Sequence, residues 1–117
     1  IKNIEPLGFF DYVKLQKNAF CVLSDSGTIS EESAILNFPA VSIRTSQERP
    51  EALDAGTIVL GGIDRDNMLS AIEIATKTYS KESKDLVRDY QDTNVSDKVI
   101  KIIQSYTDIV NKRTWKK

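Results

Sequence analysis

The chain has 117 residues, of which 40% are apolar and 28% are charged, so it is long enough for one soluble domain or for part of one. Its net charge of −1 gives no basis for a nucleic-acid or membrane partner, and no apolar run approaches the roughly 20 residues that span a bilayer. The single cysteine, Cys21, excludes an internal disulfide and suits a reducing, cytoplasmic compartment. With one cysteine and no histidine, a metal site is not expected, and we expect no cofactor.

The first elements in chain order are a predicted helix over Phe9–Asn18 and a predicted strand over residues 19–23. The strand is continuously apolar, which is typical of a parallel strand that is covered on both faces. A small polar turn over residues 24–28 leads into a predicted helix over residues 29–37. A second apolar strand over residues 40–43 follows at once and completes a strand–helix–strand unit.

A second unit of the same kind comes next. The loop over residues 44–49 is polar, and Pro50 fits the first position of a short helix that Gly56 terminates. A third apolar strand over residues 57–60 then ends in two glycines. This alternation predicts an α/β fold, with an open parallel sheet and helices on both of its faces.

The last part of the sequence predicts two more helices. Asp64 can cap the first, which we place over residues 66–80 because apolar residues recur there at helical spacing. Residues 80–94 are a charged connector with one or two helical turns. The final helix shows apolar residues at i, i+3, i+4 and i+7, can be capped by Asn94 or Ser96, and precedes a basic tail.

Both polar turns leave the carboxyl ends of strands, where open parallel sheets bind their ligands. The turn Ser26-Gly27-Thr28 lies at a helix start, whose free N–H groups and dipole favour an anion. The alternative is that Ser26 or Thr28 only caps the helix. The turn matches neither the dinucleotide G-x-G-x-x-G pattern nor a Walker loop. A carboxylate pair of Asp25 and Glu31 for acid–base chemistry is a weaker hypothesis beside such a turn.

Two charged side chains near these turns each have a functional and a plainer interpretation. Glu32 either accepts hydrogen bonds from the two hydroxyls of a ribose or only stabilises the helix dipole. Arg49 either binds a phosphate oxygen or pairs on the surface with Glu48 or Glu51.

Two linked stretches of the sequence resemble the non-hydrolysing UDP-N-acetylglucosamine 2-epimerase family. Residues 24–32 read S-D-S-G-T-I-S-E-E, and residues 48–52 read E-R-P-E-A, with A-G-T at residues 55–57. The family pattern is close to S/T-D-S-G-G-x-x-E-E, an apolar strand and E-R-P-E. The sequence departs from it at Thr28 and Ser30, and these changes resemble the branch that makes UDP-N-acetyl-L-fucosamine for bacterial capsules or O-antigen.

The resemblance implies the later part of the C-terminal domain of a two-domain, GT-B-like enzyme, with a Rossmann-like fold that binds UDP. It implies that such an enzyme inverts carbon 2 of a UDP-N-acetyl-hexosamine through elimination and re-addition of UDP. Carried over by motif, the UDP-binding residues are Ser26, Gly27, Thr28, Glu32 and Arg49. On this basis residues 1–94 are a partial UDP-binding domain, and residues 95–117 are an amphipathic helix with a basic tail.

The acids and the histidine that move protons in this family lie, by the same resemblance, in an N-terminal domain that is missing here. We therefore expect no catalytic residue in this sequence and no activity of the fragment alone. A homodimer is an option for the full-length protein. Two other hypotheses stay open: the nucleotide-binding domain of a GT-B glycosyltransferase, and a non-catalytic module that binds UDP-sugars. The linked E-R-P-E motif favours the epimerase.

Overall fold

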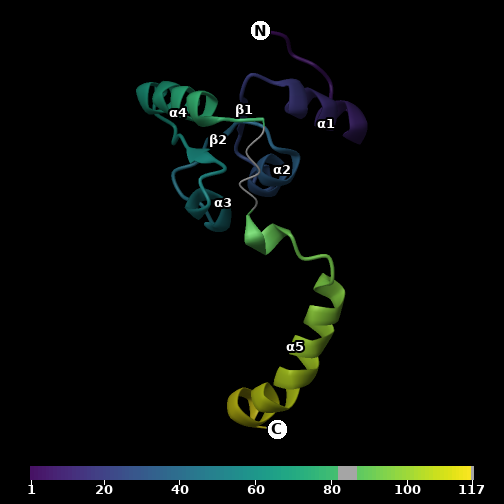
Figure 1. Ribbon diagram of the computed structural model, residues 1–117. Helices are drawn as coiled ribbons and strands as arrows, with labels where there is room; N and C mark the ends of the chain where they lie inside the picture. The colour runs from purple at the N-terminus through teal and green to yellow at the C-terminus, as the bar shows by residue number, and fades with distance from the viewer. Residues whose placement is uncertain (82–86, 117) are drawn as a thin grey trace.

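The computed structural model describes residues 1–81 and 87–116, and it shows a layered α/β unit from which one long helix projects (Figure 1). The elements in chain order are α1 (Phe9–Asn18), β1 (Val22–Ser24), α2 (Ile29–Leu36), β2 (Ala40–Ser42), α3 (Glu51–Asp54), β3 (Val59–Leu60), α4 (Arg65–Thr78), the 3-10 turn η1 (Arg88–Tyr90), α5 (Val95–Val110) and the π-helical turn η2 (Asn111–Trp115). Among the described residues, every helix falls short of the length and apolar character that a membrane crossing requires.

The three strands form a parallel sheet in the order β1-β2-β3, which confirms the predicted fold class. Val41 in the central strand pairs with Leu23 on one side and with Val59 on the other. The first strand starts later than its apolar run at residue 19, because a strand extends only where its backbone finds a partner. That pairing begins with the N–H of Val22, which donates to the carbonyl of Pro39 at 2.9 Å. Strands β1 and β3 form the two edges.

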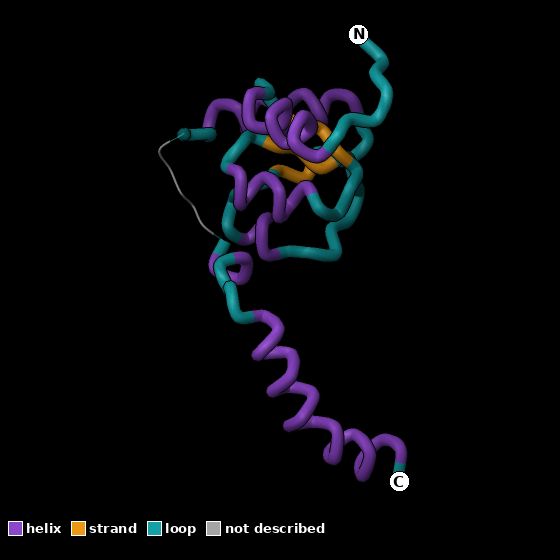
Figure 2. The backbone as a smooth tube through the Cα atoms, turned by 90° about the vertical axis from the view of Figure 1, so that its right-hand side faces the viewer, coloured by secondary structure: helices purple, strands orange, loops and turns teal. Residues whose placement is uncertain are grey.

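Helices cover both faces of the sheet, and Figure 2 shows the strands between them. Side chains along β2 alternate between the faces, so that Ala40 belongs to one apolar cluster and Val41 to the other. The cluster under α2 and α3 contains the buried residues Ile29, Phe38, Ala40, Ala52 and Ile58. The cluster under α4 contains the buried residues Val41, Ala71 and Ala75. The polar turns are thereby left at one end of the sheet, clear of both clusters.

The start of α4 follows the sequence prediction closely. The carboxylate of Asp64 accepts hydrogen bonds from the backbone N–H groups of Asp66 and Asn67, each at 3.0 Å. This satisfies two of the N–H groups that a helix start leaves open. The end of α2 differs in detail, because Asn37 adopts a left-handed φ of 52° and stops the helix before Pro39. The predicted connector over residues 80–94 lies in part outside the described residues, and its described part contains η1.

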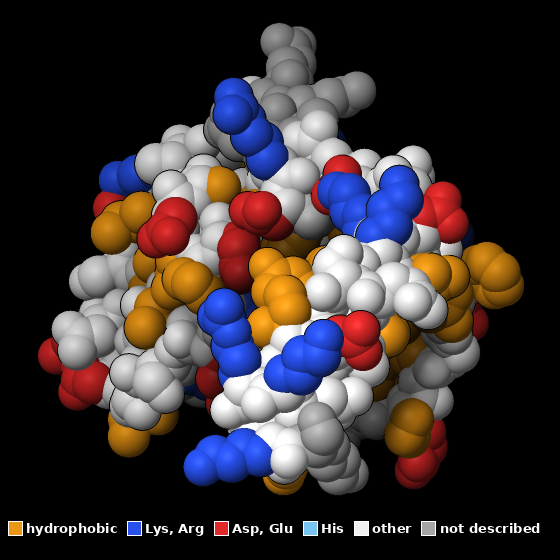
Figure 3. Space-filling view, turned by 90° about the horizontal axis from the view of Figure 1, so that it is seen from below, with side chains coloured by type: hydrophobic (Ala, Val, Ile, Leu, Met, Phe, Trp, Pro, Cys, Tyr) orange, Lys and Arg blue, Asp and Glu red, His pale blue; other side chains and the backbone are white. Residues whose placement is uncertain are grey.

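The long helix α5 leaves the α/β unit and continues into η2 (Figures 1 and 2). Every residue of α5 is exposed, including the large apolar side chains that predicted it. In the view from below, apolar side chains are accordingly visible on the surface among the charged ones (Figure 3). The predicted capping side chain is wrong in one respect: Asn94 occupies the N-cap position, but its side chain makes no capping hydrogen bond.

Candidate functional site

The turn after β1 is built by short side chains that hydrogen-bond to its own backbone. The hydroxyl of Ser24 accepts from the N–H of Ser26 at 3.1 Å, and the hydroxyl of Ser26 accepts from the N–H of Thr28 at 3.4 Å. Thr28 is the N-cap residue of α2, yet its side chain makes no capping hydrogen bond. The Thr28 part of the capping interpretation is therefore wrong, whereas the Ser26 hydroxyl does accept from an N–H group at the helix start, as that interpretation expects.

Two backbone donors at this turn have no acceptor among the described residues. They are the N–H groups of Gly27 and Glu31, neither of which is a fully buried residue. They lie around the start of α2, where the positive end of the helix dipole adds to their field. Gly27 itself lacks the side chain that would otherwise shield them. The turn can therefore receive an anion such as a phosphate group.

Arg49 brings a positive charge to the same turn from the second polar loop. Its guanidinium carbon lies 4.0 Å from the position that a Cβ atom on Gly27 would take. Its guanidinium donates to a carboxylate oxygen of Glu31, so the alternative of a surface ion pair is right in kind but wrong in its partner, which is neither Glu48 nor Glu51. The two turns, far apart in sequence, are thus brought together at the carboxyl end of the sheet.

A shallow hollow of about 250 Å³ lies between these two turns. It is lined by Gly27, Thr28, Arg44, Gln47, Glu48 and Arg49. Two of the lining side chains are cationic and one is anionic, which favours a negatively charged ligand. Arg44 was not predicted from the sequence as a site residue, although its place in the polar loop after β2 is a signal for it.

Glu32 lies beside the hollow, at the contact between α1 and α2. Its carboxylate accepts from the hydroxyl of Thr28 at 2.8 Å, from the side-chain amide of Gln16 at 2.5 Å and from the hydroxyl of Tyr12 at 3.3 Å. The Thr28 hydroxyl also lies 2.9 Å from that of Ser26. A continuous network of side-chain hydrogen bonds therefore connects the turn to α1.

The structure brings four of the predicted residues together at the turn and connects the fifth through Thr28. Gly27, Thr28 and Arg49 line the hollow, Ser26 adjoins Thr28, and Glu32 is reached through the Thr28 hydroxyl.

Sequence reasoning missed the contributions of α1. Gln16 is only 3% exposed, although most of α1 is exposed. The sequence signal that could have found it is a polar residue at helical spacing from Tyr12 and Val13. Gln47 was missed as well, and its amide donates to the buried hydroxyl of Ser30 at 2.6 Å.

Two tyrosines report negative charge around the site. Burial raises the pKa of the Tyr12 phenol above its ordinary value, and the carboxylate of Glu32 raises it further. Burial likewise raises the pKa of the Tyr90 phenol, with added contributions from Glu31 and Glu51, while Arg49 acts in the opposite direction. The carboxylates of the site therefore lie close enough to raise the pKa values of these two phenols, and Arg49 lies close enough to affect that of Tyr90.

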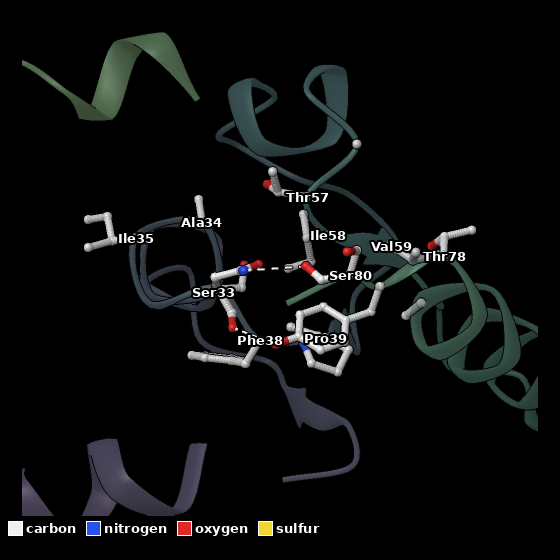
Figure 4. Close-up of a pocket in the computed structure, with 15 residues that line it drawn as sticks. Ser33, Ala34, Ile35, Phe38, Pro39, Thr57, Ile58, Val59, Thr78 and Ser80 are labelled. Carbon is white, nitrogen blue, oxygen red and sulfur yellow. Dashed lines mark hydrogen bonds between the residues drawn. The ribbon is translucent and has the colours of Figure 1, made fainter. Parts of the chain in front are cut away.

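A larger cavity of about 310 Å³ lies at the opposite end of the sheet, where β2 and β3 begin (Figure 4). Figure 4 shows Ser33 and Phe38 on one side of it and Thr57, Ile58 and Thr78 on the other. No charged side chain is among the lining residues that the structure describes. It therefore offers no counter-charge to a phosphate, and the smaller hollow is the better candidate for an anion site.

Comparison with known proteins identifies the family of the chain. The sequence model of the family described as UDP-N-acetylglucosamine 2-epimerase matches residues 1–104. The chain belongs to that family. The epimerase-like motifs at the two turns are therefore the motifs of a true family member, in a chain whose parallel α/β fold is that of the family's GT-B-like structures.

Three relatives place the chain within longer proteins. The UDP-N-acetylglucosamine 2-epimerase of Methanococcus maripaludis is 44% identical over 78 residues, which are 67% of this chain and 21% of that protein. The structure of the Rickettsia bellii enzyme is 46% identical and aligns with a TM-score of 0.78, covering 97% of this chain and 32% of that chain. The Methanocaldococcus jannaschii enzyme, solved in complex with UDP-GlcNAc and UDP, is 28% identical with a TM-score of 0.69, covering 87% of this chain and 27% of that chain. The chain thus spans about a fifth to a third of the length of these relatives.

Proposed function

We propose that this chain is the UDP-binding part of a UDP-N-acetyl-hexosamine 2-epimerase. The observation that carries the proposal is the meeting of three features at one end of the sheet. These are the N–H groups at the start of α2 that lack an acceptor among the described residues, the guanidinium of Arg49 above Gly27, and the carboxylate of Glu32 at the first turn of α2. A family relative that was solved with UDP-GlcNAc and UDP supports the choice of ligand.

The turn and Arg49 are suited to a diphosphate. The backbone and hydroxyl groups of Ser26, Gly27 and Thr28 would donate to the phosphate oxygens. Arg49 now pairs with Glu31, and its side chain is 47% exposed, so a phosphate can reach it from the hollow. When UDP departs from the sugar, negative charge develops on the diphosphate. A fixed helix start and a guanidinium stabilise that charge without first reorganising.

Glu32 is suited to the ribose. Its carboxylate is connected to the turn by one hydrogen bond from Thr28, so the turn and the carboxylate could meet neighbouring parts of one nucleotide. A carboxylate can accept hydrogen bonds from two neighbouring hydroxyls. This assigns the nucleoside end of UDP to the α1–α2 contact and the sugar end to the side of Arg49.

The whole protein would invert carbon 2 of the sugar by eliminating UDP and adding it back. That reaction needs a base and an acid on opposite faces of the sugar, and this sequence has no histidine to serve as either. We therefore assign the proton transfers to an N-terminal domain of the same protein, which would work in the cytoplasm, and we expect residues 1–117 alone to be inactive. In this division residues 1–94 contribute to UDP binding, and residues 95–117 form a separate helical unit.

The finer assignment concerns the product. Thr28 and Ser30 depart from the family pattern in the way that the UDP-N-acetyl-L-fucosamine branch does, which supports a role in precursors of capsule or surface polysaccharide. Both departures have structural consequences here. The Thr28 hydroxyl donates to Glu32, and the Ser30 hydroxyl accepts from Gln47.

Calorimetric titration of the full-length protein with UDP tests the binding role. Glu32→Ala should weaken binding by about 1.5–3 kcal/mol, the usual worth of a hydrogen bond to a charged group. Asp97→Ala, which removes the same charge from an exposed position on α5, is the matched control and should bind as the unaltered protein does. Equal affinity of the Glu32→Ala and unaltered proteins would remove Glu32 from the site, and failure of the unaltered protein to bind UDP would refute the proposal.

The reaction is tested separately by NMR in deuterated buffer. The full-length protein should introduce deuterium at carbon 2 of a UDP-N-acetyl-hexosamine, whereas residues 1–117 alone should not. Deuterium incorporation by residues 1–117 above the buffer blank would show that a base is present after all, and Asp25, Glu31 or Glu48 would have to be reconsidered.

A further inference from the structure

The carboxylate of Glu32 is held from two helices at once. Its Oε2 atom accepts from the amide of Gln16 at 2.5 Å and from the hydroxyl of Tyr12 at 3.3 Å, and both donors belong to α1. Its Oε1 atom accepts from the Thr28 hydroxyl at 2.8 Å. Because Glu32 is only partly buried, water could satisfy it, so these three donors determine its orientation rather than its solvation.

Gln16 is poorly explained by packing alone. The residue is 3% exposed, and its carbonyl oxygen, Oε1, is buried without a hydrogen-bond partner among the described residues. A buried polar atom that lacks a partner destabilises a fold, and a leucine of similar size would avoid this loss. What glutamine supplies at this position, and leucine cannot, is the N–H that donates to Glu32.

The two donors on Oε2 differ in how firmly they are held. Gln16 is buried, whereas Tyr12 is 41% exposed and its hydrogen bond to Oε2 is long, at 3.3 Å. A carboxylate has about four acceptor positions, so three donors leave one position open on Oε1. A ligand hydroxyl that displaces the Tyr12 hydroxyl gains a second position on Oε2, while Gln16 keeps the carboxylate plane fixed.

We infer that Gln16 is a positioning residue for nucleotide recognition: its amide orients the carboxylate of Glu32 to accept both ribose hydroxyls of a uridine diphosphate. The inference rests on the proposed function, because it takes Glu32 as the residue that meets the ribose. It adds α1, which carries none of the family motifs, to the binding site.

The test compares UDP with 2′,3′-dideoxy-UDP, which lacks both ribose hydroxyls, by calorimetry on the full-length protein. The unaltered protein should bind UDP at least about tenfold more tightly than the dideoxy compound, as expected for a charged acceptor that loses its donors. In Gln16→Leu this ratio should fall to below about threefold, with the loss confined to UDP and the affinity for the dideoxy compound unchanged. The melting temperature should be equal or higher, because the unpartnered carbonyl is gone.

Tyr12→Phe is the matched control, since it removes the other α1 donor from the same oxygen. It should keep the ratio of the unaltered protein, because a ligand hydroxyl replaces that donor. Two results would overturn the role of Gln16 but leave the proposed function intact. In the first, Gln16→Leu keeps the full affinity ratio. In the second, it weakens the binding of both ligands equally and has a lower melting temperature, as expected for a purely structural residue. Equal binding of UDP and the dideoxy compound by the unaltered protein, with UDP still bound, would instead overturn the ribose role of Glu32 and the inference with it.

Discussion

Helices α2 and α5 differ in opposite ways in the regularity of their apolar pattern and in their burial. Helix α5 has the clearest run of apolar residues at helical spacing, yet every one of its residues is exposed. Helix α2 has a less regular pattern, made largely of small and polar residues, yet Ile29 and Ser30 in its first turn are completely buried. The sheet on one side of α2 and α3 on the other account for this burial.

Apolar periodicity therefore predicts that a segment is helical, but not which surface the helix packs against. A helix with an apolar face is stabilised mainly by what it packs against, and for α2 that partner lies within the chain. For α5, no described residue covers the apolar face formed by Val99, Ile102, Ile103 and Tyr106, which are 47–58% exposed. The candidate site accordingly belongs to the packed helix and not to the more regular one.

The comparison is tested most strongly by truncating one isoleucine in each helix. Ile29→Ala removes a fully buried side chain under α2 and should lower the free energy of unfolding by about 2–5 kcal/mol. Ile102→Ala removes a side chain of the same size from α5 and should change it by less than about 0.5 kcal/mol. Urea unfolding followed by circular dichroism measures both in the 117-residue chain. A comparable loss in Ile102→Ala would show that α5 packs on the unit in solution.

A smaller effect is expected at the helix caps. Asp64→Ala should destabilise the start of α4 by about 1 kcal/mol, because it removes an acceptor from two backbone N–H groups. Asn94→Ala at the start of α5 should change little, because that side chain makes no capping hydrogen bond. Amide hydrogen exchange in the first turn of each helix separates the two. Equal loss of protection at both starts would mean that Asn94 does cap α5.

The smallest effect is expected from removing a single tyrosine hydroxyl inside the packed unit. The hydroxyl of Tyr90 is buried without a hydrogen-bond partner among the described residues, so Tyr90→Phe should be neutral to within about 0.5 kcal/mol, or slightly stabilising. Tyr79→Phe is the control, because the Tyr79 hydroxyl donates to the carbonyl of Asn37 at 3.0 Å and its loss should cost about 1 kcal/mol. Thermal unfolding of both variants measures these changes in stability. A larger loss of stability in Tyr90→Phe than in Tyr79→Phe would contradict the expectation.

Most of the fold could be predicted because its signals are local. The apolar runs around Val22, Val41 and Val59 and the helix-length segments between them are sufficient for a parallel sheet with helices on both faces. The strand ends could not be predicted, because they depend on where a neighbouring backbone offers a partner, as at Pro39.

The candidate site was only partly predictable for a similar reason. The turn residues and Arg49 adjoin the two strand ends that the topology brings together, so the sequence reveals them. The contacts of Glu32 with Gln16 and of Arg49 with Glu31 join segments 16 and 18 residues apart through side chains alone. No local pattern in the sequence encodes such pairs. The only sequence signal for either pair is a glutamine at helical spacing from apolar residues of α1.

The open edges of the sheet have a consequence for how the protein behaves at high concentration. Edge strands present unpaired backbone groups on which other chains can build ordered aggregates. In this structure the edge strands β1 and β3 have only three and two residues, so each offers a very short template. Aggregation by addition of strands should therefore be slow, and any self-association is expected to involve side-chain surfaces, and thus to be reversible on dilution.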